Sequence, residues 1–179
     1  MTPCAPPSKV AAEPMTTERQ YALGALFGLG KFDIGQFTPY AGRLRMRVVE
    51  VGPGFATLAL PYHEEIVGDP QRKVVFGGAV TALIDQAAGL AVACAMEELL
   101  AIATIDLRVD YLRAAAPGCE ITARADCYKL GHNVAFVRAS AWDADQSDPF
   151  ASCLGTFMVG ANSGGSPFGG FKGPAQAPS

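Results

Sequence analysis

The sequence predicts an α+β domain in which one long helix is wrapped by a curled antiparallel β-sheet of about five to six strands. Three observations lead to this fold class: one long apolar segment without proline, strand-like runs on both sides of it, and short connections between those runs. The chain has 179 residues, half of them apolar and 17% charged, which is enough for one domain with a sizeable core.

Two strands precede the long apolar segment. The stretch RLRMRVVEV (43–51) begins with strict polar–apolar alternation, the pattern of a half-buried strand. GPG at 52–54 makes a turn, and FATLALPY (55–62) supplies the partner strand. Upstream, the spacing of apolar residues in Glu18–Gly30 predicts a short amphipathic helix, which its three glycines weaken.

The long helix is predicted from Ala79 to about Glu98, a segment rich in alanine and leucine with one glycine. One of its faces is apolar at spacings of three and four: Val80, Leu83, Ile84, Ala87, Ala91 and Cys94. The opposite side is apolar as well: Ala82, Gly89, Val92, Ala93 and Met96. A helix that is apolar on all sides is buried on all sides, so we expect a second copy of the chain to cover the side away from the sheet.

Four further strand-like runs follow the helix: Ile102–Arg113, Glu120–Leu130, Asn133–Asp143 and Phe150–Val159. The turns APG, GHN and DADQSDP separate them, and such short connections suit antiparallel neighbours. Residues 1–17 and 160–179 are rich in proline, glycine and alanine and are expected to be a flexible lead and tail. A single domain at 18–159 remains.

The composition narrows the range of functions. The net charge of −3 without any run of like charges argues against nucleic acid as a partner. The longest uninterrupted apolar stretch, Ala87–Met96, is short for a bilayer span. Five cysteines without the spacing of a redox or zinc motif, and only two histidines, predict no metal site. Prolines and Glu13 occur where a secretory signal needs an apolar core, so a reducing cytoplasm is expected.

Asp85 is the charged residue of the apolar run VVFGGAVTALID (74–85). Because a buried carboxylate without partners is costly, two interpretations stay open. Asp85 is either a structural carboxylate bonded to Thr81, Gln86 or a strand backbone, or a base or nucleophile at an active site. Gly77 and Gly78 precede the predicted helix, whose first amides lack intrahelical partners and are suited to bind an oxyanion. A flexible turn would explain the two glycines equally well.

Three segments together resemble the hotdog-fold acyl-CoA thioesterases of the phenylacetate-pathway type: VVFGGAVTALIDQAAGLAVA, TIDLRVDYLRAAAPG and KLGHNVAFVRASAWD. The resemblance covers roughly residues 43–159. It implies a hotdog fold, homodimers and often homotetramers, and a site between protomers. It further implies that Asp85 is the general base or nucleophile, that the Gly77 N–H polarises the thioester carbonyl, and that Thr104 helps to hold the water.

The sequence departs from this family at two positions. Phe76 stands where the family usually has a histidine before Gly-Gly, and Asp69 stands where relatives often have an asparagine. Phe76 can neither donate nor accept a hydrogen bond, and losing one donor near the reacting carbonyl costs roughly 10²–10³ in rate. Slow hydrolysis, or acyl-CoA binding without turnover, are the alternatives. A dehydratase of this fold needs a catalytic histidine, and neither His63 nor His132 is well placed for one.

The predicted substrate-binding set combines the residues beside the reacting carbonyl with basic residues suited to the phosphates of CoA. It comprises Phe76, Gly78, Asp69, Arg113, Lys129 and His132. For each basic residue, a solvated surface charge is the alternative. Cys94, on the apolar face of the helix, is interpreted as an inert buried thiol. No metal and no redox cofactor are expected, since the CoA group belongs to the substrate.

Overall fold

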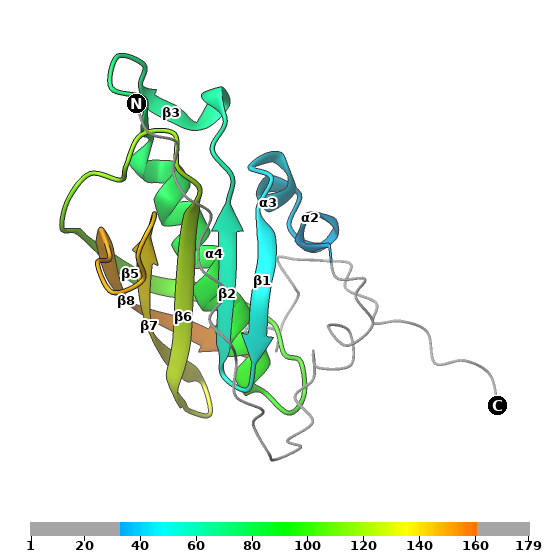
Figure 1. Ribbon diagram of the computed structural model, residues 1–179. Helices are drawn as coiled ribbons and strands as arrows, with labels where there is room; N and C mark the ends of the chain where they lie inside the picture. The colour runs from blue at the N-terminus through cyan, green and yellow to red at the C-terminus, as the bar shows by residue number, and fades with distance from the viewer. Residues whose placement is uncertain (1–32, 161–179) are drawn as a thin grey trace.

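A six-stranded antiparallel sheet curls around the long helix α4 (Gly77–Ala95) in the computed structural model, which describes residues 33–160 (Figure 1). The predicted helix at Glu18–Gly30, the predicted lead, and the tail beyond Gly160 lie outside the described residues. The predicted fold class, one long helix wrapped by a curled antiparallel sheet, is confirmed.

The strand order of the sheet is β1-β2-β6-β7-β8-β5, with every neighbouring pair antiparallel. Its strands are β1 (Arg47–Gly52), β2 (Phe55–Leu60), β5 (Ile102–Tyr111), β6 (Ile121–Leu130), β7 (Val134–Trp142) and β8 (Ala151–Val159). β5 pairs with β8, the last strand, and not with β6, which follows it in the chain. The ten-residue strand β5 therefore forms one free edge of the sheet.

The predicted turn between the first two strands is present. Gly52 pairs with Phe55, which leaves Pro53 and Gly54 as the two residues of the loop. Gly54 has a φ of 77°, a left-handed conformation that glycine adopts without steric cost, and proline suits the position before it. This hairpin places β1 at the other edge of the sheet.

The predicted first strand is wrong for residues 43–46. Two short helices, α2 (Ile34–Phe37) and α3 (Pro39–Arg43), precede β1, and Pro39 stands at the first position of α3, where its fixed φ suits a helix. Arg45, with a φ of 58°, then reverses the chain before β1 begins. The alternation of residues 43–46 therefore belongs to a helix end and a turn.

Between β2 and α4 the chain adds a small ribbon that the sequence did not predict. One 3-10 turn, η1 (Glu64–Ile66), leads into the antiparallel pair β3 (Val67–Asp69) and β4 (Val74–Val75). Strands of two or three residues are too short to show a periodicity. The Phe76 amide donates to the Ile66 carbonyl at 2.8 Å, which ties this ribbon to the start of α4.

Helix α4 is displaced toward the N-terminus relative to the prediction. Phe76 is extended and caps the helix, so Gly77 and Gly78 are its first two residues and not a preceding turn. The helix ends at Ala95 because Met96 is extended, with φ −86° and ψ 141°. The acidic residues Glu97 and Glu98, predicted at the helix end, are exposed outside it.

Most of α4 is buried within one chain. Its contacts run across β2, β6 and β7, and even Val92, Ala93 and Met96, predicted to need a second protomer, are buried by their own chain. The strong curl of the sheet accounts for this difference. Apart from the terminal residues Gly77 and Ala95, what stays incompletely buried is one stripe of the helix: Gly78, Thr81, Ala82, Asp85, Gln86 and Gly89.

By length and composition alone, α4 is long and apolar enough to cross a membrane, which the count of uninterrupted apolar residues did not predict. Asp85 interrupts the apolar run without lowering the mean hydropathy of the helix enough to exclude a span. Core helices meet the same criterion because they too are surrounded by apolar groups, and α4 is packed inside the sheet.

Candidate active site

Asp85 lies in the middle of α4 on the open stripe, and it is half-buried. Its carboxylate oxygen Oδ1 accepts a hydrogen bond from the Thr104 hydroxyl of β5 at 2.9 Å. The partner of Asp85 is thus Thr104, and neither Thr81 nor Gln86. The structure brings together the two residues that the sequence resemblance paired.

An irregularity in β5 directs Thr104 toward the helix. Thr104 pairs with Phe157 of β8, whose side chain is buried against the core, while Asp106 pairs with Thr156, and the register shifts between the two pairs. Residues that pair across strands share a face of the sheet, so Thr104 faces α4. Bulges of this kind re-aim side chains beside functional sites.

The carboxylate of Asp85 is only partly satisfied. None of the ion pairs within residues 33–160 involves Asp85, and Thr104 supplies its one hydrogen bond there. An ionised carboxylate can accept about four hydrogen bonds. Asp85 therefore keeps capacity for a water molecule or for an approaching carbonyl carbon.

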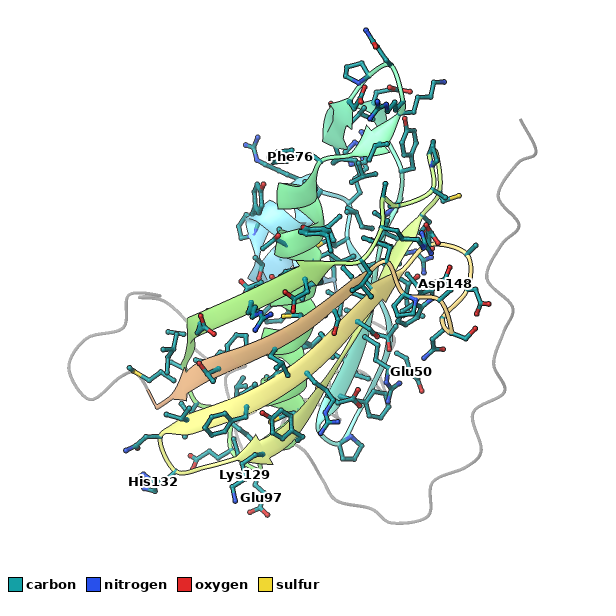
Figure 2. All side chains as sticks on the ribbon, turned by 90° about the vertical axis from the view of Figure 1, so that its left-hand side faces the viewer. Glu50, Phe76, Glu97, Lys129, His132 and Asp148 are labelled. Carbon is teal, nitrogen blue, oxygen red and sulfur yellow. The ribbon has the colours of Figure 1, made fainter. Side chains whose placement is uncertain are left out.

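The first turn of α4 offers two amide donors. The N–H groups of Gly77 and Gly78, as the first two of the helix, have no intrahelical acceptor, and neither donates elsewhere in the described chain. Phe76 lies at the same end of the molecule (Figure 2), and its side chain is 60% exposed. A Cβ on Gly78 would lie 2.3 Å from the Phe76 ring, so the ring lies directly over Gly78.

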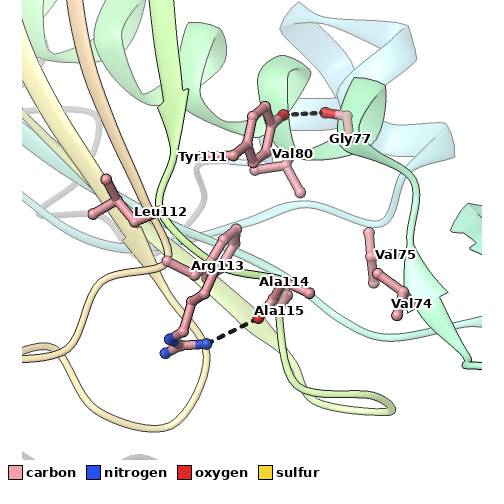
Figure 3. Close-up of a pocket in the computed structure, with 10 residues that line it drawn as sticks. Val74, Val75, Gly77, Val80, Tyr111, Leu112, Arg113, Ala114 and Ala115 are labelled. Atoms are coloured by element: carbon pink, nitrogen blue, oxygen red, sulfur yellow. Dashed lines mark hydrogen bonds between the residues drawn. The ribbon is translucent and has the colours of Figure 1, made fainter.

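A surface pocket of about 400 Å³ opens beside this turn (Figure 3). Its wall combines the first turn of α4 with β4 and the end of β5, and most lining side chains are apolar: Val74, Val75, Val80, Leu112, Ala114, Ala115 and Phe150. Gly77 and Tyr111 also line the pocket, with the Tyr111 hydroxyl 2.7 Å from the Gly77 carbonyl oxygen. An apolar group next to free amides is the kind of ligand that such a pocket suits.

Asp85 and Gly77 of one chain are too far apart to act on one carbonyl. Eight residues of α-helix separate them, which at about 1.5 Å per residue is about 12 Å along the axis. A base and an oxyanion donor both lie within hydrogen-bonding distance of the reacting atoms. One chain alone therefore does not assemble both groups around the same thioester.

Asp69 has a structural role in the turn of the β3–β4 ribbon. Its Oδ1 accepts hydrogen bonds from the Gln71 and Arg72 amides at 3.0 and 3.1 Å. This is the local side-chain-to-backbone pattern that makes aspartate common in turns. The Asp69 carboxylate is thus held in its own turn, and its predicted contact with the substrate stays a prediction.

Arg113 is likewise engaged within its own chain. Its guanidinium forms a two-point ion pair with Asp143, at 2.8 and 3.0 Å, and donates to the Asp148 carbonyl at 2.8 Å. Asp143 is buried and also accepts from the Ala116 and Ala144 amides. The hydrogen bonds from Arg113, followed by those from these amides, hold the pKa of Asp143 well below its ordinary value. Arg113 also lines the pocket beside the first turn of α4, and its predicted phosphate contact stays a prediction.

Lys129 and His132 lie at the opposite end of the molecule from Phe76 (Figure 2). Lys129 lies near the end of β6 and His132 in the β6–β7 turn, and both are exposed. The His132 Nδ1 lies 2.7 Å from the Asn133 side-chain oxygen. They lie beside the end of α4, whose 19 residues span about 28 Å. Within one chain these two residues do not join Gly77 and Gly78.

Cys94 is not a nucleophile in this environment. Its side chain is 1% exposed within the core, and burial raises its pKa to about 12. A thiol that stays protonated is a poor nucleophile, which agrees with the interpretation from sequence.

Sequence reasoning missed Tyr111, which the structure places on the first turn of α4. Its position at the end of a strand gave no sign of a contact with a helix that begins 34 residues earlier. The available signal was its place inside the quoted segment TIDLRVDYLRAAAPG, in which Thr104 was the residue singled out.

Comparison with known proteins shows the family to which this chain belongs. The Thioesterase superfamily matches residues 72–150, which include α4 and β5 to β7. The chain is 30% identical over 135 residues to the medium/long-chain acyl-CoA thioesterase YigI of Salmonella typhimurium, across 68% of this chain and 86% of the relative. The chain belongs to the thioesterase superfamily.

Solved structures of this superfamily and its relatives share the fold. A Pseudomonas aeruginosa protein is 34% identical with a TM-score of 0.63, and the match covers 69% of this chain and 91% of that protein. A mutant of the phenylacetic acid degradation protein PaaI from Thermus thermophilus is 25% identical with a TM-score of 0.59, covering 67% and 97%. This thioesterase is therefore a hotdog-fold thioester hydrolase.

Proposed function

We propose that this thioesterase hydrolyses acyl- or aryl-CoA thioesters at a site shared by two copies of the chain. Asp85 activates water or attacks the carbonyl carbon, and the Gly77 N–H of the second copy holds the developing oxyanion. The observation that carries the proposal is the hydrogen bond from Thr104 to Asp85, on the incompletely buried stripe of α4.

Thr104 gives the Asp85 carboxylate a fixed orientation while leaving it reactive. The hydroxyl donates to Oδ1, so the other oxygen stays available to accept a proton from water or to attack carbon. In the water route, the water oxygen adds to the thioester carbon as Asp85 takes one proton. The C–S bond then breaks, and the CoA sulfur leaves as thiol once that proton reaches it.

Two copies are proposed because the two groups lie about 12 Å apart along one helix. When two α4 helices run antiparallel about a twofold axis, Asp85 of one lies near Gly77 of the other. The free edge of β5 supports this arrangement. It is ten residues long and carries the 53% exposed Ile105, and an unpaired edge of this kind is suited to pair with a second copy.

The substrate class follows from the pocket and from the family. Its apolar wall beside the free amides suits an acyl or aryl group whose thioester lies at the start of α4. The Salmonella relative is a medium/long-chain acyl-CoA thioesterase, which supports CoA thioesters as substrates. None of the proposed steps needs a metal or a redox cofactor. Phe76 adds no hydrogen bond to the carbonyl, so we expect modest turnover.

Release of free thiol from a panel of acyl- and aryl-CoAs tests the proposal, with Asp85→Asn beside the wild type. We expect turnover to fall about 10²–10⁴-fold, because a positioned base contributes a factor of that size. Asp126→Asn is the control, since Asp126 lies on β6 and pairs there with Arg124 at 3.3 Å. If Asp85→Asn hydrolyses CoA thioesters as fast as this control, Asp85 is not the base.

A further inference from the structure

Tyr111 connects the end of β5 to the first turn of α4 (Figure 3). Its hydroxyl lies 2.7 Å from the Gly77 carbonyl oxygen and 3.1 Å from the Thr81 hydroxyl. Its ring forms part of the wall of the apolar pocket. One side chain from the edge strand thus contacts both ends of the turn that carries the proposed oxyanion donor.

The direction of these hydrogen bonds is determined by their chemistry. A carbonyl oxygen only accepts, so the single proton of the Tyr111 hydroxyl is donated to Gly77. The Thr81 hydroxyl must then donate to the Tyr111 oxygen. The result is a relay from Thr81 through Tyr111 to the Gly77 carbonyl.

The Gly77 carbonyl belongs to the same planar peptide group as the Gly78 N–H. A donor that holds this oxygen therefore also fixes the direction of the Gly78 N–H, and chains of hydrogen bonds polarise the groups they join. Two successive glycines have the greatest conformational freedom to lose at this point. The Tyr111 hydroxyl restrains the segment of α4 in which the backbone is otherwise least restrained.

We infer that Tyr111 is a positioning residue, which holds the first turn of α4 in the geometry that binds the thioester oxygen. This inference rests on the proposed function and adds the Gly78 N–H to it as a second oxyanion donor beside the Gly77 N–H. It assigns Tyr111 to these donors and not to the base. Tyr111 acts through the backbone of Gly77 and Gly78 and does not exchange a proton with the substrate.

Tyr111→Phe removes the hydroxyl and keeps the ring in the pocket wall. We expect kcat to fall about tenfold with KM nearly unchanged, since removing a donor outright costs roughly 10²–10³ and this variant only misorients the donors. Thr81→Val removes only the donor to Tyr111 and leaves the bond to Gly77. We expect it to lower kcat less than Tyr111→Phe does.

Tyr128→Phe is the matched control, because Tyr128 is 51% exposed and Tyr111 is 49% exposed. Tyr128 lies on β6 and packs against Phe136 and Arg138 of β7, away from α4. We expect its kcat and KM to equal those of the wild type. All variants are measured with the same acyl-CoA, together with their thermal midpoints.

Two results would overturn the inference. In the first, Tyr111→Phe keeps the kcat of the Tyr128→Phe control. In the second, the kcat of Tyr111→Phe falls only in proportion to the loss of folded protein. If Tyr111→Phe does not fold at all, an unchanged kcat in Thr81→Val decides against the relay. The Asp85→Asn variant distinguishes failure of the Tyr111 inference from failure of the proposed function. If Asp85→Asn is inactive while Tyr111→Phe is unaffected, only the role of Tyr111 is rejected.

Discussion

Asp85 and Asp143 are the same residue type in two contrasting environments. Asp143 is 6% exposed and accepts hydrogen bonds from both terminal nitrogens of Arg113 and from two backbone amides. Asp85 is half-buried, has no cation beside it in the described chain, and accepts one hydrogen bond, from Thr104. The Asp143 carboxylate thus accepts four hydrogen bonds and the Asp85 carboxylate one.

The difference agrees with the roles proposed for the two residues, a catalytic one for Asp85 and a stabilising one for Asp143. A buried carboxylate whose oxygens are all engaged anchors the connections around it but has no electron pair to offer a substrate. A carboxylate oriented by one hydroxyl keeps free electron pairs for a substrate or a water molecule, at the cost of partial desolvation. Satisfaction of hydrogen bonds, more than burial alone, therefore separates the two roles.

The largest change in thiol release is expected when two inactive variants are mixed. The mixture tests whether Asp85 of one chain and Gly77 of a second chain form one active site. Gly77→Pro removes the amide donor at the first helical position, where proline is tolerated, and Phe76, at φ −62° and ψ 129°, suits a following proline. We expect Gly77→Pro and Asp85→Asn to be nearly inactive alone. Unfolded together and refolded, they should recover about a quarter of wild-type thiol release, since half the dimers are mixed and each has one intact site.

The control for this experiment is each variant refolded with itself. A site built within a single chain would show no recovery in the mixture, because every chain then carries one defect. That result would contradict the shared site and leave the role of Asp85 intact.

Asp143→Asn should affect stability far more than catalysis. The substitution removes the buried one of the two carboxylates that Arg113 faces, which are Asp143 and Asp148, and places an amide donor against guanidinium donors. We expect the free energy of unfolding to fall by roughly 2–4 kcal/mol, while thiol release per folded molecule stays within the same order of magnitude. Urea denaturation followed by fluorescence measures the first quantity, and the CoA assay measures the second.

Asp145→Asn is the matched control for this substitution. Asp145 lies in the same connection but is exposed, and its carboxylate accepts hydrogen bonds from Ser147. We expect Asp145→Asn to lower the free energy of unfolding much less than Asp143→Asn does. Equal losses in the two variants would show that the Arg113 pair adds nothing to stability.

A smaller effect is expected in the pH dependence of stability. Because Arg113 and the neighbouring amides lower the pKa of Asp143 in the folded state, its contribution is fully present above the unfolded-state pKa of about 3.9. The contribution is lost as the pH falls below that value toward the folded-state pKa. Between pH 6 and pH 3, the urea midpoint should fall less in Asp143→Asn than in the wild type. Parallel decreases in both proteins would rule out this contribution.

The fold was largely predictable because its signals are local. The proline-free run from Ala79 to about Glu98 indicated the helix, which the structure has at Gly77–Ala95, and the turns at 52–54 and 131–133 marked the hairpins. Prediction was wrong where a local pattern had more than one physical outcome. The alternation at residues 43–46 belongs to a helix end and a turn.

The sequence by itself determined the long wrapped helix and the strands of the main sheet. It also singled out Asp85, since a charge in an apolar helix is visible without coordinates. Only the tertiary structure decided that β5 lies at the free edge beside β8 and that a bulge turns Thr104 toward Asp85. It also decided that Tyr111 reaches Gly77. Strand order and register depend on contacts between segments far apart in the chain, which no local pattern encodes.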